Sequence, residues 1–176
     1  VGASVGAGVG LEDGTVCLIE ANNTNMRVYA SWKHSTKSLT LVKFSRDGLC
    51  LAVASADCNM YLYRSTDGQT FLRQAVCQGH SGVIKHMDFS GSSQYVASCC
   101  DKYALLFWDN RGNAVKDASV LRDETWANNG VRTTPYGWAV QGIAKNETVN
   151  TTVKTVCALP EVGDVVVGDS DGKVRL

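Results

Sequence analysis

The chain has 176 residues, enough for one domain, and its 44% hydrophobic and 19% charged residues are typical of a folded protein rather than a disordered one. Its 17 Lys and Arg residues balance its 17 Asp and Glu residues, so no net field favours nucleic acid or an anionic membrane. No apolar run approaches the ~20 residues of a membrane-spanning helix, and the seven cysteines, odd in number and irregularly spaced, favour a reduced intracellular protein.

The N-terminal stretch 1–10 is rich in Gly, Ala and Val and carries glycine at every second position from Gly6 to Gly10. This spacing differs from the G-x-G-x-x-G of dinucleotide-binding loops, and no helical pattern follows it. We therefore expect a strand in which small residues allow a neighbouring strand to approach closely. Asp13-Gly14 then predicts a hairpin turn into a strand over 15–19.

Further strands are expected between Met26 and Cys77, because short apolar or alternating runs are separated there by turn residues. These runs cover 26–32, 39–44, 49–55, 59–63 and 71–77. We expect 26–32 and 71–77 to be outer strands, each belonging to the unit that follows it.

The stretch that best defines the chain begins with Gly79-His80 and ends with Trp108-Asp109. Between these pairs lie three strand-like runs at 83–89, 95–98 and 104–108, and the last is almost entirely apolar, as in a strand buried on both faces. Gly-His, three short strands and Trp-Asp form the repeat signature of a β-propeller blade.

The same pattern recurs along the chain. Phe44 precedes a turn as Phe89 does 45 residues later, and Tyr63 stands 45 residues before Trp108. A last unit ends at 170–176, one residue short of the position that Trp108 occupies in its own unit. The two 45-residue spacings match the roughly 40–45 residues of one blade, and the last unit is about 24 residues longer.

We therefore expect an all-β, WD-repeat β-propeller with about four four-stranded blades. The blades are placed at roughly 1–25, 26–66, 67–110 and 111–176, the last with an insertion at about 110–150. Propellers close with about 4–8 blades, and the pattern is cut at both ends, so we expect an open arc that the remainder of its own propeller completes. A closed ring formed by these residues alone would contradict this.

Within a WD-repeat blade a His, a Ser or Thr, an Asp and a Trp form a hydrogen-bonded network. The second blade offers four residues for such a network: His34, Ser55, Asp57 and Tyr63. His34 is one residue further from the strand than usual.

The third and fourth blades match the network less well. The third offers His80 and Trp108, but Cys100 stands at the Ser position and Lys102 at the Asp position. The last blade keeps Asp171. The repeats are therefore degenerate.

A catalytic interpretation of the third blade is weaker than the structural one. His80 beside Asp101, with Cys99 or Cys100, would resemble an activated cysteine nucleophile. Strand-borne cysteines in a blade are usually inert packing, and the Gly-His motif already explains the histidine. We expect no catalytic residue.

Metal binding is also disfavoured. Cys77-x-x-His80 lacks a second pair of ligands at zinc-like spacing. Asp169-Ser170-Asp171-Gly172 resembles the start of a calcium loop, but no Glu closes the loop. We expect a hairpin turn there, and no metal or cofactor.

The segment 117–142 interrupts the repeat pattern. It contains Trp126, Tyr136 and Trp138, which either pack over the blade or form a contact surface. We expect packing, because loop aromatics without a known partner are more often anchors.

The same segment carries a family resemblance. Arg122-Asp123-x-x-Trp126-Ala127, followed by Val140-Gln141-Gly142-Ile143, resembles the C-terminal propeller of echinoderm microtubule-associated protein-like (EMAP-like) proteins. The preceding Gly-His…Trp-Asp blade and the final Asp-Gly-Lys-Val-Arg-Leu fall in the same order in that family. The resemblance covers most of the chain, and it implies a WD-repeat fold, tubulin or microtubule binding, and a place in the cytoplasm and cytoskeleton, in the spindle or in cilia.

The leading interpretation is a non-enzymatic interaction module of a cytoskeletal protein that binds tubulin or microtubules. Tubulin surfaces are acidic, so we expect contacts from cations at predicted loops: Lys33, Lys37, Arg46, Arg111 and Lys116. The alternative is a WD-repeat scaffold that binds a peptide or another protein without contacting tubulin. An enzyme is disfavoured because no carboxylates or histidines cluster on the expected inner strands.

Overall fold

The computed structural model describes residues 5–21, 25–102, 104–126, 153–159, 164–169 and 172–175. In these ranges the chain forms antiparallel β-sheets and one short 3-10 helix, η1 (Ala118–Leu121). The expected all-β fold is therefore confirmed.

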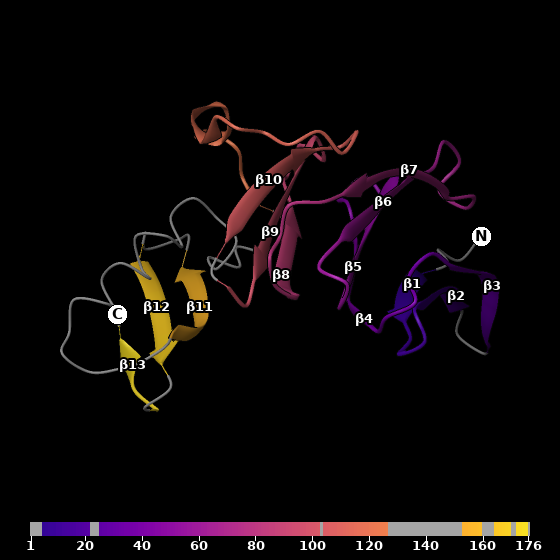
Figure 1. Ribbon diagram of the computed structural model, residues 1–176, viewed down its shortest axis with the longest axis horizontal. Helices are drawn as coiled ribbons and strands as arrows, with labels where there is room; N and C mark the ends of the chain where they lie inside the picture. Colours follow the sequence, from indigo (N-terminus) through magenta and orange to yellow (C-terminus); the bar gives the residue numbers. More distant parts are fainter. Residues whose placement is uncertain are drawn as a thin grey trace.

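The strands form four sheets that follow one another in chain order (Figure 1). The first sheet contains β1 (Val5–Gly10), β2 (Thr15–Ala21) and β3 (Met26–Lys33). The second contains β4 (Leu39–Phe44), β5 (Cys50–Ser55), β6 (Met60–Arg64) and β7 (Leu72–Cys77). The third contains β8 (Ile84–Phe89), β9 (Tyr95–Cys100) and β10 (Leu105–Asp109). The fourth contains β11 (Val153–Leu159), β12 (Asp164–Asp169) and β13 (Val174–Arg175).

The outer strands belong to different blades from those expected. The strand at 26–33 pairs with β2, and the strand at 72–77 pairs with β6, so each closes the sheet before it rather than opening the next. In each case the outer strand forms an antiparallel hairpin with the strand that precedes it. The sheets therefore change after β3 and after β7, and not at 26 and 67.

The sheets stand side by side in an open row, with the first at one end and the fourth at the other (Figure 1). The strands β1, β4 and β8 lie next to one another along the inner side of this row. Glycine makes the close approach possible, because a Cβ at Gly8 would lie 2.6 Å from Val42 Cγ1 and one at Gly10 would lie 2.7 Å from Leu39 Cβ. The open arc and the close packing of the glycine-rich strand are both as expected.

The core lies between neighbouring sheets, and β5 shows how it is built. Successive side chains of a strand point to opposite faces. Cys50, Ala52 and Ala54 accordingly join the cluster shared with the third sheet, whereas Leu51 and Val53 join the cluster shared with the first. Leu51 is fully buried, which stabilises the fold by about 1.5–3 kcal/mol relative to an exposed side chain.

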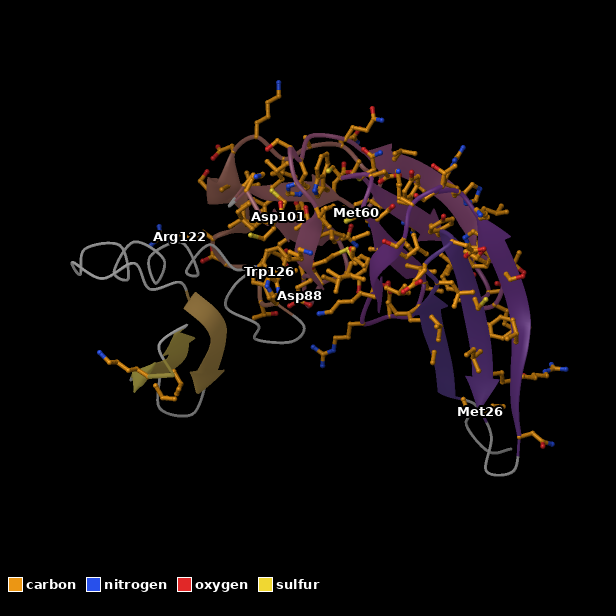
Figure 2. All side chains as sticks on the ribbon, turned by 60° about the horizontal axis from the view of Figure 1, so that its bottom comes forward. Met26, Met60, Asp88, Asp101, Arg122 and Trp126 are labelled. Atoms are coloured by element: carbon orange, nitrogen blue, oxygen red, sulfur yellow. The ribbon has the colours of Figure 1, made fainter. Side chains whose placement is uncertain are left out.

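Because neighbouring strands run antiparallel, the turns of the first three sheets gather at two opposite ends. One end, here called the histidine end, carries the turns 11–14, 34–38, 56–59, 78–83 and 101–102. The other, the arginine end, carries the turns 45–49, 65–71, 90–94 and 110–113. Figure 2 shows Asp101 at the histidine end, with Asp88 and Trp126 toward the arginine end.

Candidate functional site

The third sheet contains a buried hydrogen-bonded network centred on Ser98. The Ser98 hydroxyl oxygen lies 2.7 Å from His80 Nε2 and accepts a hydrogen bond of 2.9 Å from Trp108 Nε1. Ser98 is fully buried, and His80 is 8% exposed. The structure thus brings the two expected residues of this blade together, through a serine that sequence reasoning missed.

The missed serine has a simple geometric signal. Ser98 stands two residues before Cys100, which was assigned to the Ser position, and residues two apart share one face of a strand. Ser98 and Cys100 therefore face the same side of β9, and Ser98 joins the network because it carries the hydroxyl group.

The third-sheet network lacks an acid. His80 Nδ1 is buried and has no hydrogen-bond partner among the described residues. Lys102 stands where the second sheet has Asp57, and the neighbouring Asp101 is exposed and lies against Gly82. Burial lowers the pKa of His80, so this imidazole is held neutral.

In the second sheet, the residues expected to form one hydrogen-bonded network form two separate groups. His34 Nδ1 lies 2.8 Å from the hydroxyl oxygen of Tyr63. Separately, the Ser35 hydroxyl lies 2.8 Å from Ser55 Oγ and donates to Asp57 Oδ2 at 3.0 Å. Ser35, which stands 45 residues before His80, therefore takes the place expected of His34.

Asp57 is the acid of this second network. Tyr61 donates its hydroxyl proton to Asp57 Oδ2 at 2.6 Å, and the backbone N–H of Asn59 donates to Oδ1 at 2.9 Å. Partial burial works against ionisation, but these hydrogen bonds outweigh it and lower the pKa of Asp57. The counterpart in the last blade, Asp171, lies outside the described residues.

The five expected tubulin contacts do not share one surface. Lys33 and Lys37 lie at the histidine end, and Lys33 Nζ is 3.7 Å from Asp13 Oδ2. Arg46 and Arg111 lie in turns of the arginine end. Lys116 follows the bridge between Trp108 and Ala114 and lies along the outer side of the third sheet.

The described arginines gather at one end of the first three sheets, whereas the lysines are divided, with Lys43 next to the turn 45–49 of the arginine end. The arginines with described side chains all lie at or next to the arginine end: Arg27, Arg46, Arg64, Arg73, Arg111 and Arg122. The histidine end carries lysines instead, and Lys37, Lys85 and Lys102 are exposed there. Among the described residues, Arg27 pairs with Glu20 at 3.2 Å, and the other five arginines form no ion pair.

The family-signature segment is partly described. Arg122 and Asp123 are exposed, whereas Trp126 is 7% exposed and packs on Phe107 with ring centroids 5.9 Å apart. Packing, rather than a contact surface, is therefore the role of Trp126. The remaining residues of the signature, Val140, Gln141 and Gly142, lie outside the described residues, as do Tyr136 and Trp138.

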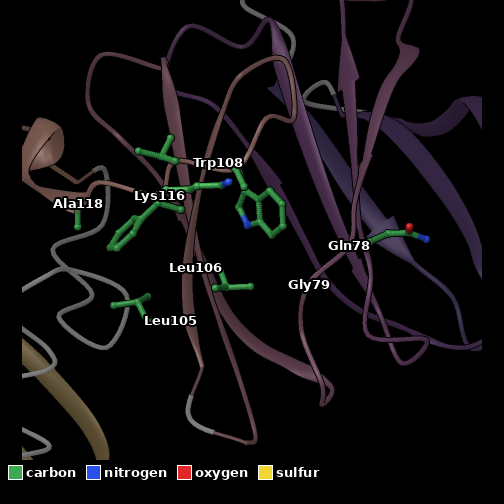
Figure 3. A pocket seen from close by; sticks show the side chains of 10 residues that line it. Gln78, Gly79, Leu105, Leu106, Trp108, Lys116 and Ala118 are labelled. Atoms are coloured by element: carbon green, nitrogen blue, oxygen red, sulfur yellow. The ribbon is translucent and has the colours of Figure 1, made fainter.

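A groove of about 610 Å³ runs along the outer side of β10 (Figure 3). Leu105, Leu106 and Trp108 line it from the strand, and Lys116 and Ala118 line it from the segment that follows. The lining is mainly apolar and brings together no set of acid–base groups.

The cysteines near His80 are buried rather than activated. Cys99 and Cys100 are 6% and 3% exposed, and burial raises the pKa of Cys77 to about 12. Within the described ranges no group of three or more His, Cys, Asp or Glu residues is placed to hold a metal ion. Nor does any described helix have the length and apolarity to span a membrane.

The sequence matches a known family over almost its whole length. Residues 4–176 match the family described as the echinoderm microtubule-associated protein second beta-propeller. The chain is 33% identical over 142 residues to echinoderm microtubule-associated protein-like 1 of Mus musculus. This aligned region covers 80% of this chain and 17% of that protein. Over 138 residues it is 33% identical to the 77 kDa echinoderm microtubule-associated protein of Strongylocentrotus purpuratus, which covers 77% of this chain and 20% of that protein. The chain thus spans a small part of these relatives.

Two solved structures share the fold. The C-terminal WD40 domain of Sif2 superimposes with a TM-score of 0.67 at 12% identity, covering 96% of this chain and 52% of that chain. The Cps50 (Swd1) beta-propeller domain of Myceliophteria thermophila gives a TM-score of 0.52 at 19% identity, covering 63% and 38%. These likenesses identify the fold as a WD40 β-propeller.

Proposed function

The chain belongs to the echinoderm microtubule-associated protein family, and on that premise we propose that it is a non-enzymatic interaction module that binds tubulin or microtubules. The observation that carries the proposal is the family match over residues 4–176. It is supported by the architecture, because rigid sheets hold short turns in fixed positions at two accessible ends. The proposal includes a location in the cytoplasm on the cytoskeleton, including the spindle or cilia, and the family match supports it.

The chemistry of the described residues supports a binding role over a catalytic one. The buried histidine of the third sheet is neutral and bonded to Ser98, and the neighbouring cysteines are buried. Both observations fit groups that hold a blade together rather than groups that react with a substrate.

Co-sedimentation of the full-length protein with microtubules tests this function. We expect the protein to pellet with microtubules, and the bound fraction to fall as salt rises, because contacts between exposed charges are screened. A protein that stays in the supernatant at low salt would overturn the proposal.

A second candidate is a scaffold that binds another protein without contacting tubulin. It is favoured by the balance of 17 basic and 17 acidic residues, which gives the chain no overall attraction to an acidic surface. Affinity capture of the full-length protein that recovers one stable partner in stoichiometric amount and no tubulin would favour this candidate.

A further inference from the structure

The uncharged turn 90–94 is the hub of the arginine end. Ser93 Oγ accepts a hydrogen bond of 3.3 Å from the backbone of Asp47, in the turn 45–49. The carbonyl oxygen of Gln94 accepts one of 2.8 Å from the backbone of Asn110, in the turn 110–113. Two neighbouring turns are thereby fixed to one central turn.

The segment 122–126 is fixed to the same hub. Ser92 donates its hydroxyl proton to Glu124 Oε2 at 2.7 Å, and Gly91 donates its backbone N–H to the carbonyl oxygen of Thr125. Ser90 and Trp126 form an antiparallel bridge. The turns 45–49, 90–94 and 110–113 and the segment 122–126 therefore form one hydrogen-bonded surface at the arginine end.

Three of these segments each present an arginine, Arg46, Arg111 and Arg122, around the uncharged hub. All three are exposed, and within the described part of the chain none of the three guanidinium groups forms an ion pair or a side-chain hydrogen bond. A guanidinium group offers five N–H donors in a planar fork that matches a carboxylate. The surface therefore carries three guanidinium groups that have no protein acceptor among the described residues, each on a hydrogen-bonded segment.

The nearby aspartates are occupied by the turns themselves. Asp47 accepts hydrogen bonds from the Ser45 hydroxyl and from the backbone N–H of Leu49. Asp109 Oδ1 accepts from two backbone N–H groups of its own turn, at 2.9 and 2.8 Å. Partial burial opposes ionisation of Asp109, yet the side-chain and backbone donors of Asn113 lower its pKa. These carboxylates stabilise the turns, and among the described residues neither forms an ion pair with one of the three arginines.

We propose that the arginine end is the docking surface for an extended, glutamate-rich polypeptide segment, held by Arg46, Arg111 and Arg122. The three arginines come from three separate segments, each of which is hydrogen-bonded to the hub. That arrangement suits carboxylates spaced along an extended chain better than a single phosphate group. The inference rests on the proposed function, since it names the surface that meets an acidic segment of tubulin.

The test compares two sets of charge changes in the full-length protein. The first is Arg46→Glu, Arg111→Glu and Arg122→Glu at the arginine end. The matched control, here called the lysine variant, is Lys85→Glu, Lys102→Glu, Thr36→Asp and Ser81→Asp at exposed positions of the histidine end, which changes the net charge by the same amount. Microtubule co-sedimentation and binding of a labelled poly-glutamate peptide are measured for both variants, after circular dichroism has shown unchanged unfolding.

We expect the arginine variant to bind both probes about tenfold more weakly or worse, with the lysine variant close to wild type. If both variants bind microtubules and the peptide like wild type, the docking surface is wrong while the proposed function stands. If wild type fails to bind microtubules, the proposed function is wrong, and peptide binding alone tests the docking surface. Loss of peptide binding in the arginine variant but not in the lysine variant supports the docking surface. Any other result overturns it.

Asp123 provides a test of opposite sign. It is exposed and adjacent to Arg122, so its negative charge would repel an acidic segment. Asp123→Asn is expected to bind the poly-glutamate peptide about twofold more tightly. Weaker binding by this variant, or tighter binding of a single-stranded RNA than of the peptide by wild type, would contradict a carboxylate-binding surface.

Discussion

Lys43 and Asp88 stand 45 residues apart, at the same position of successive repeats, and Lys43 Nζ lies 3.0 Å from Asp88 Oδ1. The pair links β4 of the second sheet to β8 of the third. The Asp88 side chain is 3% exposed and that of Lys43 is 30% exposed. Asp88 also accepts a hydrogen bond of 3.1 Å from the backbone of Phe89. Lys43 and Asp88 thus occupy equivalent positions in successive repeats, and the ion pair between them joins neighbouring blades.

Lys43→Met is expected to reduce the free energy of unfolding by about 2 kcal/mol, because it leaves the buried Asp88 carboxylate without its cation. The value lies below that of a fully buried pair because Lys43 is partly exposed. Urea unfolding followed by tryptophan fluorescence measures it. Lys85→Met, at an exposed position, is the control and should change stability by less than about 0.5 kcal/mol. Equal stability of the two variants would show that the pair contributes nothing.

Ser98→Ala removes the shared partner of His80 and Trp108. Two buried polar groups then lose their hydrogen bond at once, so we expect a loss of about 2–3 kcal/mol in the free energy of unfolding. Ser81→Ala, which removes an exposed hydroxyl in the adjoining turn, should be nearly neutral. The role assigned to Ser98 fails if both alanine variants unfold at the same urea concentration.

His80 makes stability depend on pH. Burial lowers its pKa below the ordinary value of 6.5, so the unfolded chain binds the proton more readily than the folded one. The stability contributed by neutral His80 is therefore present above about pH 6.5 and is lost as pH falls through the folded pKa.

The expected result is a steeper loss of stability below about pH 6.5 in wild type than in His80→Gln. His34 acts in the same direction, because burial and then the charge of Arg73 lower its pKa, and it remains present in both proteins. Parallel pH profiles for wild type and His80→Gln would exclude His80 as the source.

Lys102→Asp supplies the acid that the third-sheet network lacks. A carboxylate 45 residues after Asp57 would offer an acceptor to His80 Nδ1, which is unpartnered among the described residues. We expect the pKa of His80 to rise and the free energy of unfolding at neutral pH to increase by about 1 kcal/mol. NMR titration of the imidazole measures the pKa. Lys102→Ala is the control, and a similar His80 pKa in the two variants would show that the acid does not reach the ring.

Periodicity predicted the repeat unit well because hydrophobic burial leaves a regular trace. Phe44 and Phe89, 45 residues apart, end the inner strands β4 and β8, although Phe44 is half-buried and Phe89 is 1% exposed. What periodicity did not reveal is which sheet a strand joins. The strand at 72–77 fits either neighbour by pattern, and the hairpin to β6 decides its partner.

Hydrogen-bond networks were harder to predict than strands because they depend on one or two atoms. The sequence indicated that His80 and Trp108 belong together, but not that Ser98 joins them. In the second sheet Ser35 replaced His34 for a similar reason, since a shift of one residue moves a side chain to another face. The expected tubulin contacts were chosen from loops alone, and loop position does not tell which end of a sheet a turn occupies.

We propose that this propeller meets tubulin through the turns of its arginine end. Hydrogen–deuterium exchange of the full-length protein, with and without microtubules, tests it most directly. The account predicts that microtubules slow exchange in peptides covering 45–49, 90–94 and 110–113, while peptides covering 34–38 and 78–83 at the opposite end are unchanged. Unchanged exchange at the arginine end in the presence of saturating microtubules would contradict it.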